Sequence, residues 1–312
     1  MWIFKAFFAE DREYFEYDTM GIQGYPATQK EFPFLESLLS FSELVLAPLE
    51  SLVLESCENW DRFFETGDRS NSDHAMALLS ELGQQHIYFQ LEYLRCFARH
   101  SQQKLMPEMV ENLRQLPGQL AAYQKQIQCF FDRVLDIDRV GRDTQAWMKE
   151  NYYYNQPLSA ELFAFRPVPV AVEAMPRVGY VDVLYPNDIR DLIDFSLREC
   201  VRRQMPVRQC KNCGRYFPLT VRVTAEYCSR PTASGRPCRA TGAIQTWTEK
   251  RKEDDVFQLY RREYKRRFAW IKAGKITEEE FYRWSEVART KKKECDSGVI
   301  SLDKFKEWIK NS

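Results

Sequence analysis

The spacing of apolar positions in the first half of the chain predicts long amphipathic helices. Apolar residues recur every three or four positions over residues 31–66, 72–101 and 119–151, as they do on the buried face of a helix. Pro48 lies inside the first of these runs and is expected to break or kink it, because proline has no backbone N–H to donate. The density of leucine, phenylalanine and tyrosine on these faces favours the core of a helical bundle over a cofactor-binding surface.

Two other stretches have the features of extended backbone. Aromatic and charged residues alternate near the N-terminus, which predicts one or two strands with a turn near Gly21 and Gly24. Residues 157–186 contain five prolines between short apolar segments, so we expect short strands that link two domains. A helix over residues 187–203 is expected to follow.

Basic amphipathic helices are predicted for the C-terminal end, where a short internal repeat occurs. The corresponding residues are Gly274, Thr277, Phe281 and Trp284 in the first copy, and Gly298, Ser301, Phe305 and Trp308 in the second. Thr277 and Glu280 have the spacing of a capping box, in which the two side chains bond each other's backbone N–H. Two copies are fewer than a repeat array needs, so we predict a helical hairpin.

Four cysteines in the middle of the basic half have the spacing C-x2-C-x14-C-x9-C. They are Cys210, Cys213, Cys228 and Cys238. Four thiolates this close in sequence suit a tetrahedral Zn2+ ion. Gly214 directly follows the first pair and suits a turn with positive φ, and Phe217 is expected to shield the site from water. The alternative is four unrelated cysteines, some of them buried as small apolar residues.

The histidines bear on whether the metal would be catalytic. His74, His86 and His100 all lie in the first hundred residues, far in sequence from the cysteines. A site made of cysteines alone has no open coordination position, so we expect one structural zinc ion and no catalytic residues on this module. An enzyme site in the N-terminal domain stays a distant alternative, which a pocket gathering these histidines with carboxylates would favour.

Charge divides the chain into two halves although the net charge is zero. Residues 201–312 carry 27 lysines and arginines against 14 acidic residues, and residues 1–200 carry 18 against 31. The basic half suits a polyanionic partner, or it suits docking on the acidic half of the same chain. The two interpretations are compatible.

The basic charge is most concentrated around the cysteines. Residues 201–248 contain nine lysines and arginines and a single acid, Glu226. The arginines nearest the predicted ligands are Arg215, Arg222, Arg230, Arg236 and Arg239. The aromatic residues among them are Tyr216, Phe217, Tyr227 and Trp247. Arginines bind phosphates and aromatic rings stack on bases, so these arginines are candidate DNA or RNA contacts. Docking of the same surface on a protein partner is the competing hypothesis.

The N-terminus and the other cysteines indicate where the protein works. The first residues are apolar, but the stretch is short, lacks a basic start and runs into charged residues, so no signal peptide is expected. No apolar run approaches the length of about 18 residues needed to span a bilayer. The chain has nine cysteines. Without export they are expected to be reduced thiols, so we predict a cytoplasmic protein with no membrane partner.

The cysteine region resembles two known groups of proteins. Its C-x2-C-G-x2-F knuckle and Tyr227-Cys228-Ser229 turn resemble CGNR-type zinc fingers of bacterial regulators, but Arg239-Ala240 follows Cys238 where those have Gly-Asn-Arg. The knuckle, the late Cys-Arg pair and the two terminal repeat units are similar to an uncharacterised bacterial family, domain of unknown function 6076. That resemblance covers about the last 130 residues and implies a bacterial, cytoplasmic, zinc-binding protein without an established activity.

Together these features predict a mainly α protein with minor β structure and a zinc ribbon or treble-clef-like module. The expected divisions are an acidic helical domain over 1–156, a linker with short strands over 157–186, a zinc module over 187–248 and basic helices over 249–312. The first functional hypothesis is a non-enzymatic protein that binds nucleic acid or acts as a regulator. The alternative is a protein-interaction scaffold that uses the basic half, or an exposed apolar patch around Trp284 and Trp308.

Overall fold

The structure is a computed structural model of the whole chain. It describes residues 4–18, 27–135, 162–175, 178–220, 224–242, 244 and 254–312. The chain divides into two compact units. The first comprises Met1–Cys210 and Gly214–Glu226, and the second comprises Lys211–Cys213 and Tyr227–Ser312. The described residues are mainly helical with a small antiparallel sheet, which confirms the predicted class.

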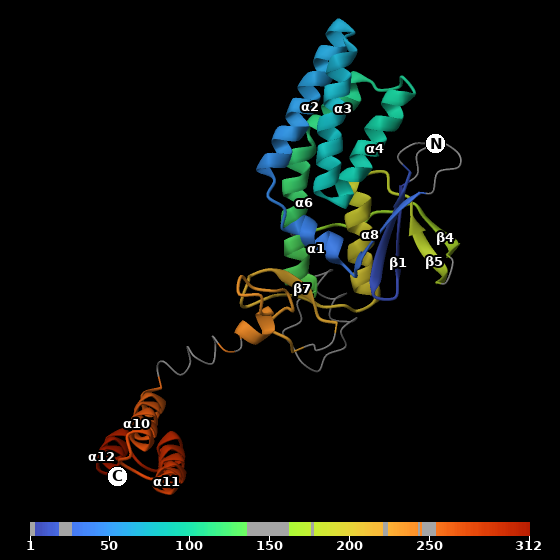
Figure 1. Ribbon diagram of the computed structural model, residues 1–312. Helices are drawn as coiled ribbons and strands as arrows, with labels where there is room; N and C mark the ends of the chain where they lie inside the picture. Colours follow the sequence, from blue (N-terminus) through green and yellow to red (C-terminus); the bar gives the residue numbers. More distant parts are fainter. Residues whose placement is uncertain are drawn as a thin grey trace. The chain divides into compact units, whose positions relative to one another are not determined.

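The sheet of the first unit has five antiparallel strands in the order β3-β2-β1-β5-β4 (Figure 1). Their bounds are β1 Phe4–Ala9, β2 Arg12–Tyr17, β3 Thr28–Pro33, β4 Val170–Met175 and β5 Gly179–Leu184. Strands β1 and β2 pair from Phe4 opposite Tyr17 to Ala9 opposite Arg12. Alternating side chains of these two strands enter the core, because successive residues of a strand face opposite sides of a sheet.

Both predicted extended regions belong to this sheet. The N-terminal region forms three strands, and a turn at Glu10 joins β1 to β2. Gly21, Gly24, Pro157 and Pro176 lie outside the described residues.

The segment expected to link two domains instead supplies β4 and β5. Strand β5 pairs with β1, with Ala6 opposite Leu184 and Phe7 opposite Val183. Val183 and Leu184 are fully buried, so the end of this strand is part of the core of the first unit.

The helices of the first unit are α1 Glu36–Ser42, α2 Ala47–Thr66, α3 Arg69–Gln85, α4 Ile87–Ser101, α5 Pro107–Arg114, α6 Leu116–Phe130, the π-helical turn η1 Phe131–Leu135, and α8 Ile189–Arg202. Helices α2, α3 and α4 run side by side, and α6 lies against α2 and α1 (Figure 1). The predicted helical bundle is therefore present, built against the sheet.

The predicted helices are more divided than expected. The run over 31–66 breaks before α2, and Pro48 lies in the first turn of that helix, where no N–H bond is lost. The single helix predicted over 72–101 is two helices separated at His86, whose backbone is extended and whose Nδ1 accepts a hydrogen bond from the Tyr88 N–H. The prediction for 119–151 is met by α6 and η1 as far as Leu135, and residues 136–151 lie outside the described part.

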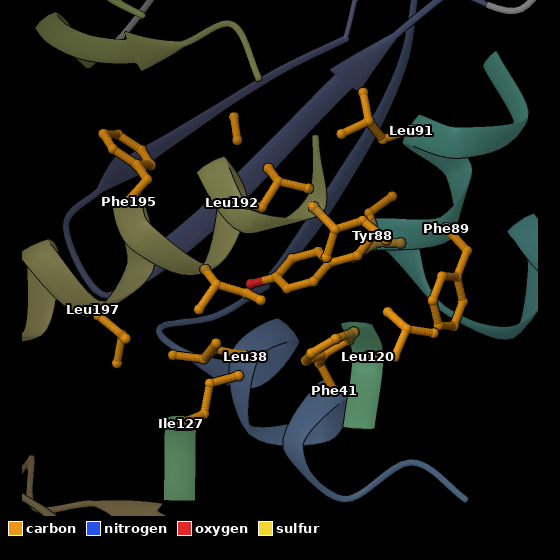
Figure 2. Packing of buried hydrophobic residues seen from close by; sticks show 14 of the residues in the cluster. Leu38, Phe41, Tyr88, Phe89, Leu91, Leu120, Ile127, Leu192, Phe195 and Leu197 are labelled. Carbon is orange, nitrogen blue, oxygen red and sulfur yellow. The ribbon is translucent and has the colours of Figure 1, made fainter. Parts of the chain in front are cut away.

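Helix α8 and the start of α4 cover the core face of the sheet. The rings of Phe8 and Phe195 lie 5.4 Å apart, and those of Phe15 and Tyr88 lie 6.3 Å apart. Figure 2 shows Tyr88 at the centre of the cluster, surrounded by side chains from α1, α6 and α8. The helix predicted over 187–203, at the start of the expected zinc module, is α8, which is buried in this core and belongs to the first unit.

A buried polar network crosses this core. Glu13 accepts hydrogen bonds from the Ser37 N–H at 2.5 Å and the Ser37 hydroxyl at 3.0 Å. The Tyr88 hydroxyl lies 3.2 Å from the Ser37 hydroxyl and 3.3 Å from that of Ser196. Because Nδ1 of His86 accepts a bond, its Nε2 carries the ring proton and donates to the Ser37 carbonyl at 3.0 Å. Strand β2 and helices α1, α4 and α8 therefore share one set of hydrogen bonds.

Burial shifts the protonation of this network. It raises the pKa of Glu13 to about 8, even though both Ser37 donors favour the carboxylate. It lowers the pKa of His86 to about 4, so this ring is neutral near pH 7. The tyrosine at its centre also has a raised pKa for the same reason. The network is thus uncharged near neutral pH, as its apolar surroundings require.

Three helices form a small bundle at the C-terminal end: α10 Asp255–Lys272, α11 Glu278–Asp296 and α12 Leu302–Asn311. The predicted hairpin is α11 and α12, and both also contact α10. The capping box of Thr277 and Glu280 is confirmed, and Ser301 caps α12 by accepting a hydrogen bond from the Lys304 N–H, without the reciprocal bond that Glu280 makes in α11. Phe281 and Phe305 from the two repeat copies are buried, whereas both repeat tryptophans are only half-buried.

Within the described part of the chain, no single helix has the length and apolar character to cross a membrane. One pair, α1 with α2, meets that standard only when taken together, and it is bent by 87°. The apolar residues of this pair, such as Leu38 and Val53, are fully buried in the core of the first unit.

Candidate metal centre

The first two cysteines lie at the turn of a short hairpin. Strands β6 Val207–Gln209 and β7 Tyr216–Pro218 pair with Gln209 opposite Tyr216. The Gly214 N–H donates to the Cys210 carbonyl at 2.8 Å, and the Cys210 N–H donates to the Arg215 carbonyl at 2.8 Å. Gly214 has φ of 72°, as the sequence predicted, which a side chain would strain. This tight knuckle is what brings the two thiols of the C-x2-C pair together.

The other two cysteines are held by a second set of backbone bonds. The Cys238 N–H donates to the Arg230 carbonyl and the Arg239 N–H to the Cys228 carbonyl, both at 2.9 Å. Pro231 and Pro237 pair across the loop between them, and Cys238 begins a short helical stretch. These bonds fix the conformation of the nine-residue spacer between Cys228 and Cys238, which the sequence did not predict.

The same stretch is packed tightly against the tyrosine that precedes Cys228. A Cβ added at Gly242 would lie 2.4 Å from the ring of Tyr227 and 3.1 Å from Cβ of Asn212. Gly242 is therefore required for close approach, and the loop after Cys238 has little freedom to move away from the first knuckle residues.

The four cysteine sulfurs all lie within 4.8 Å of one another. The Sγ atoms of Cys213 and Cys228 are 3.7 Å apart. Four thiolates at about 2.3 Å from a tetrahedral Zn2+ would be separated by about 3.8 Å, so this spacing fits such an ion. Cys210, Cys228 and Cys238 are buried, and Cys213 is exposed. The cluster could therefore hold a metal ion.

A side-chain donor also faces the cluster. The Asn212 amide donates to Sγ of Cys238 at 3.3 Å. Such hydrogen bonds orient a thiolate ligand and reduce its charge density. Asn212 lies between the two knuckle cysteines in sequence, but the spacing rule for zinc sites assigns it no role, so sequence reasoning missed it.

The three histidines lie elsewhere. His86 is in the buried network described above, His74 is exposed and lies 3.5 Å from Glu55, and the ring of His100 lies 5.0 Å from that of Trp60. Among the described residues, the cluster of possible metal ligands contains cysteines alone. All four tetrahedral positions would be taken by the protein, which leaves none for water or substrate.

The structure separates the candidate arginines by environment. Arg236 and Arg239 are exposed, and Arg230 is half-buried. Nε of Arg215 lies 3.6 Å from a carboxylate oxygen of Glu43 on the first unit's own loop after α1. Arg222 lies outside the described residues.

Two of the aromatic residues expected to face nucleic acid are not available for it. Tyr216 and Phe217 are buried. The Tyr216 hydroxyl donates to Asp132 at 2.8 Å, and its ring lies 5.0 Å from that of Phe131. This tyrosine anchors the knuckle hairpin to η1, which sequence alone could not show because the two residues are far apart in the chain. Trp247 lies outside the described residues.

A cavity of about 250 Å3 in the first unit bears on the enzyme alternative. It lies between α4, α5 and α6, and its polar lining includes Glu92, Arg95 and Asp188. Both carboxylate oxygens of Glu92 lie 3.0 Å from one guanidinium nitrogen of Arg95. None of the three histidines lines this cavity. The arrangement that would have favoured an N-terminal active site is therefore not found there.

Comparison with known families finds a match to the C-terminal part of the chain. Residues 178–307 match the model of a family of unknown function (DUF6076). The match runs from the start of β5 to within α12, so it includes the four cysteines and most of the terminal bundle. It confirms the resemblance drawn from the knuckle and the repeat units. In comparisons with curated proteins and with solved structures, nothing matches the chain.

Proposed function

We propose that the chain binds one structural Zn2+ at its four cysteines and acts without catalysis as a nucleic-acid-binding or regulatory protein. The observation that carries this proposal is the placement of exposed arginines on the loop that the metal would order. Cys228 and Cys238 bracket this loop, Arg236 lies within it, and Arg239 follows it directly. In the same proposal, the β6–β7 hairpin, the knuckle and the helical stretch after Cys238 make up a treble-clef-like zinc module.

Zinc suits the donor set better than harder cations do. Thiolates prefer soft or borderline metals, whereas Mg2+ and Ca2+ prefer oxygen. A four-thiolate zinc centre carries a charge of about −2, so nearby cations also lower its electrostatic cost. The arginines around the loop lower the electrostatic cost of the zinc centre in this way, and their guanidinium groups are also exposed at the surface.

Arg236 and Arg239 are the strongest candidates for phosphate contacts. Among the residues that the structure describes, neither has an acidic group within ion-pair distance, whereas Arg215 has Glu43. An unpaired guanidinium can form two hydrogen bonds to a phosphate, with no internal ion pair to break. Arg215, Arg222 and Arg230 remain candidates for supporting contacts.

The test is a fluorescence-anisotropy titration of zinc-loaded protein with DNA and RNA oligonucleotides at low and moderate salt. We expect binding that weakens steeply with salt, because each phosphate contact releases counterions. Combined Arg236→Glu and Arg239→Glu substitution is expected to reduce the slope of log K against log salt by about 2. Combined Arg62→Glu and Arg69→Glu substitution, on α2 and α3, makes the same change of charge at two other exposed positions and serves as the control.

Zinc content must be measured on each sample, so that loss of metal is not mistaken for loss of contacts. Wild-type affinity and salt slope in the double variant would overturn the assignment of these arginines. No binding by zinc-loaded wild-type protein at low salt would overturn the nucleic-acid proposal itself.

One observation favours the alternative, in which the basic half docks on acidic protein surfaces. The Arg215–Glu43 pair already joins a knuckle arginine to the helical part of the first unit. The terminal bundle also exposes apolar side chains, among them Tyr282 at 62% and Val299 at 72% exposure. Stoichiometric zinc with no oligonucleotide binding would favour this scaffold role.

A further inference from the structure

A shallow groove on the terminal bundle combines aromatic rings with positive charge. Its volume is about 270 Å3, and it is lined by Phe257, Tyr260, Arg261 and Tyr264 of α10 and by Arg289 of α11. The three rings are half-buried, and both arginines are exposed. None of these lining residues is acidic. The groove therefore presents ring surface with cationic groups from two different helices.

The two arginines of the groove differ from Arg262 and Arg266 in having no acidic partner among the described residues. Glu263 is buried and takes the ion pairs of the adjacent α10 arginines, with Arg266 at 2.5 Å and Arg262 at 3.9 Å. Within the described ranges, no carboxylate lies within 4.0 Å of a guanidinium nitrogen of Arg261 or Arg289. Their charge is therefore available to a ligand, whereas Arg262 and Arg266 share the single negative charge of Glu263.

The aromatic side of the groove is held in place by the core of the bundle. The ring of Tyr264 lies 5.0 Å from that of the buried Phe281, and the ring of Tyr260 lies 5.9 Å from that of Tyr264. The Phe257 N–H is capped by the Asp254 carboxylate at 2.8 Å, which fixes the first turn of α10. A ligand ring would thus meet a prearranged surface, which reduces the entropy lost on binding.

This combination fits a ligand that has a planar ring and a negative charge close to it. An unstacked nucleotide has both, because its base can lie on an aromatic side chain while its phosphate binds arginine. Duplex nucleic acid keeps its bases stacked and offers only its phosphates to so shallow a site. We propose that the groove binds one nucleotide of single-stranded DNA or RNA, with its base on Tyr260 and its phosphate on Arg261 and Arg289. This inference rests on the proposed nucleic-acid function and adds a second, single-strand-selective site to it.

The test uses the full-length zinc-loaded protein and fluorescein-labelled 12-nucleotide thymidine and uridine strands, with a duplex of equal length for comparison. We expect the single strands to bind more tightly than the duplex. Tyr260→Leu is expected to weaken single-strand binding about fivefold to a hundredfold, the usual effect of losing one stacked base. Arg289→Gln is expected to weaken it and to reduce the salt slope by about 1.

Two matched variants separate this role from a structural one. Tyr260→Phe retains the ring and is expected to bind like wild type. Arg283→Gln removes an exposed arginine from the same helix as Arg289, but one already paired with Glu279 at 4.0 Å, and is expected to change affinity less than twofold. Circular dichroism of each variant shows whether the bundle remains folded. If Tyr260→Leu does not fold, Arg289→Gln decides the test, because Arg289 is exposed and its replacement should leave the bundle folded.

Each outcome distinguishes the inference from the function it rests on. Wild-type single-strand affinity in both Tyr260→Leu and Arg289→Gln, with wild-type protein still binding, would overturn the groove and leave the zinc-module proposal standing. Displacement of the labelled strand by uridine monophosphate at equal molar concentration would identify a free-nucleotide site instead. Absence of binding by wild-type protein would overturn the nucleic-acid function first.

Discussion

The first unit and the cysteine loop become ordered by different means. Helices and sheet in the first unit bury large side chains completely, as at Trp60 and Tyr88. Over residues 224–242, by contrast, the buried positions are Cys228, Cys238 and one glycine. A segment without an apolar core gains too little to offset the conformational entropy lost on ordering. A bound metal can supply the free energy needed to offset this entropy loss. The first unit obtains it from its apolar core.

The terminal bundle lies between these two cases. Its fully buried large side chains are Phe281, Phe305 and Ile309, and much of the remaining aromatic surface is half-exposed. Small domains bury a smaller share of their surface and are only marginally stable. The arginines and rings of both proposed nucleic-acid sites, Arg236 and Arg239 on the cysteine loop and the groove on α10 and α11, lie in these parts with small cores.

Removing the metal is the change that should separate the two regions most strongly. Cys228→Ser is expected to lose most of an apparent binding free energy of about 10–16 kcal/mol, because three thiolates and a hydroxyl bind zinc far more weakly than four thiolates. Limited proteolysis should then cut within residues 224–242, while the first unit stays resistant. Metal content is measured on the same sample by a colorimetric chelator.

The control is Cys295→Ser, which replaces a half-buried cysteine outside the cluster and should retain one zinc per chain. If Cys228→Ser kept stoichiometric metal and wild-type protease resistance, the difference between the regions would not be due to a metal.

Deleting one buried ring from the core of the first unit, or one from the core of the terminal bundle, tests whether these two regions unfold independently. Phe89 and Phe305 are both fully buried. Phe89→Ala is expected to destabilise the first unit by about 3–5 kcal/mol, and Phe305→Ala is expected to have a similar local cost in a much smaller core. Hydrogen exchange by mass spectrometry should therefore show loss of protection throughout α10–α12 for Phe305→Ala and none in the first unit.

Equal loss of protection in both units after either substitution would show that they unfold as one. Stability would then be shared along the chain instead of residing separately in each region.

A smaller effect is expected from pH, and only in the first unit. Glu13 has a folded-state pKa of about 8, above its usual value, so the folded state holds this proton more tightly than the unfolded state does. Stability should therefore fall as pH rises towards 8, by about 1.5 kcal/mol between pH 6.5 and 8. Urea unfolding of wild type and Glu13→Gln at both pH values measures this, and the variant should show no such fall.

Between pH 6.5 and 8 the contribution of His86 to stability is small. Its pKa is lowered to about 4 from an ordinary value of 6.5, so it stabilises the fold increasingly as pH rises to about 6.5 and adds only about 0.4 kcal/mol above that. Below pH 6.5 the contributions of Glu13 and His86 to stability change with pH in opposite directions. A wild-type stability that did not fall between pH 6.5 and 8 would show that Glu13 is ionised in the fold.

Much of the metal site could be predicted because its signals are local. The spacing of Cys210 and Cys213, followed by Gly214, defines a knuckle through backbone geometry within five residues. The sequence assigned the spacer between Cys228 and Cys238 to the site but did not predict its conformation. That conformation depends on backbone hydrogen bonds across the loop. The role of Asn212 and the burial of Tyr216 depend on partners that are distant in sequence.

By itself, the sequence determined the helical class, the four possible metal ligands, the capping box at Thr277 and the two aromatic repeat copies. Each of these follows from periodicity or spacing over fewer than about 30 residues, where local sterics and hydrogen bonding dominate. Only the tertiary structure decided that β4 and β5 join the sheet, that the helix predicted over 72–101 breaks at His86, and that Arg261 and Arg289 meet at one groove. Those outcomes depend on which distant surfaces bury each other, and no local pattern encodes that choice.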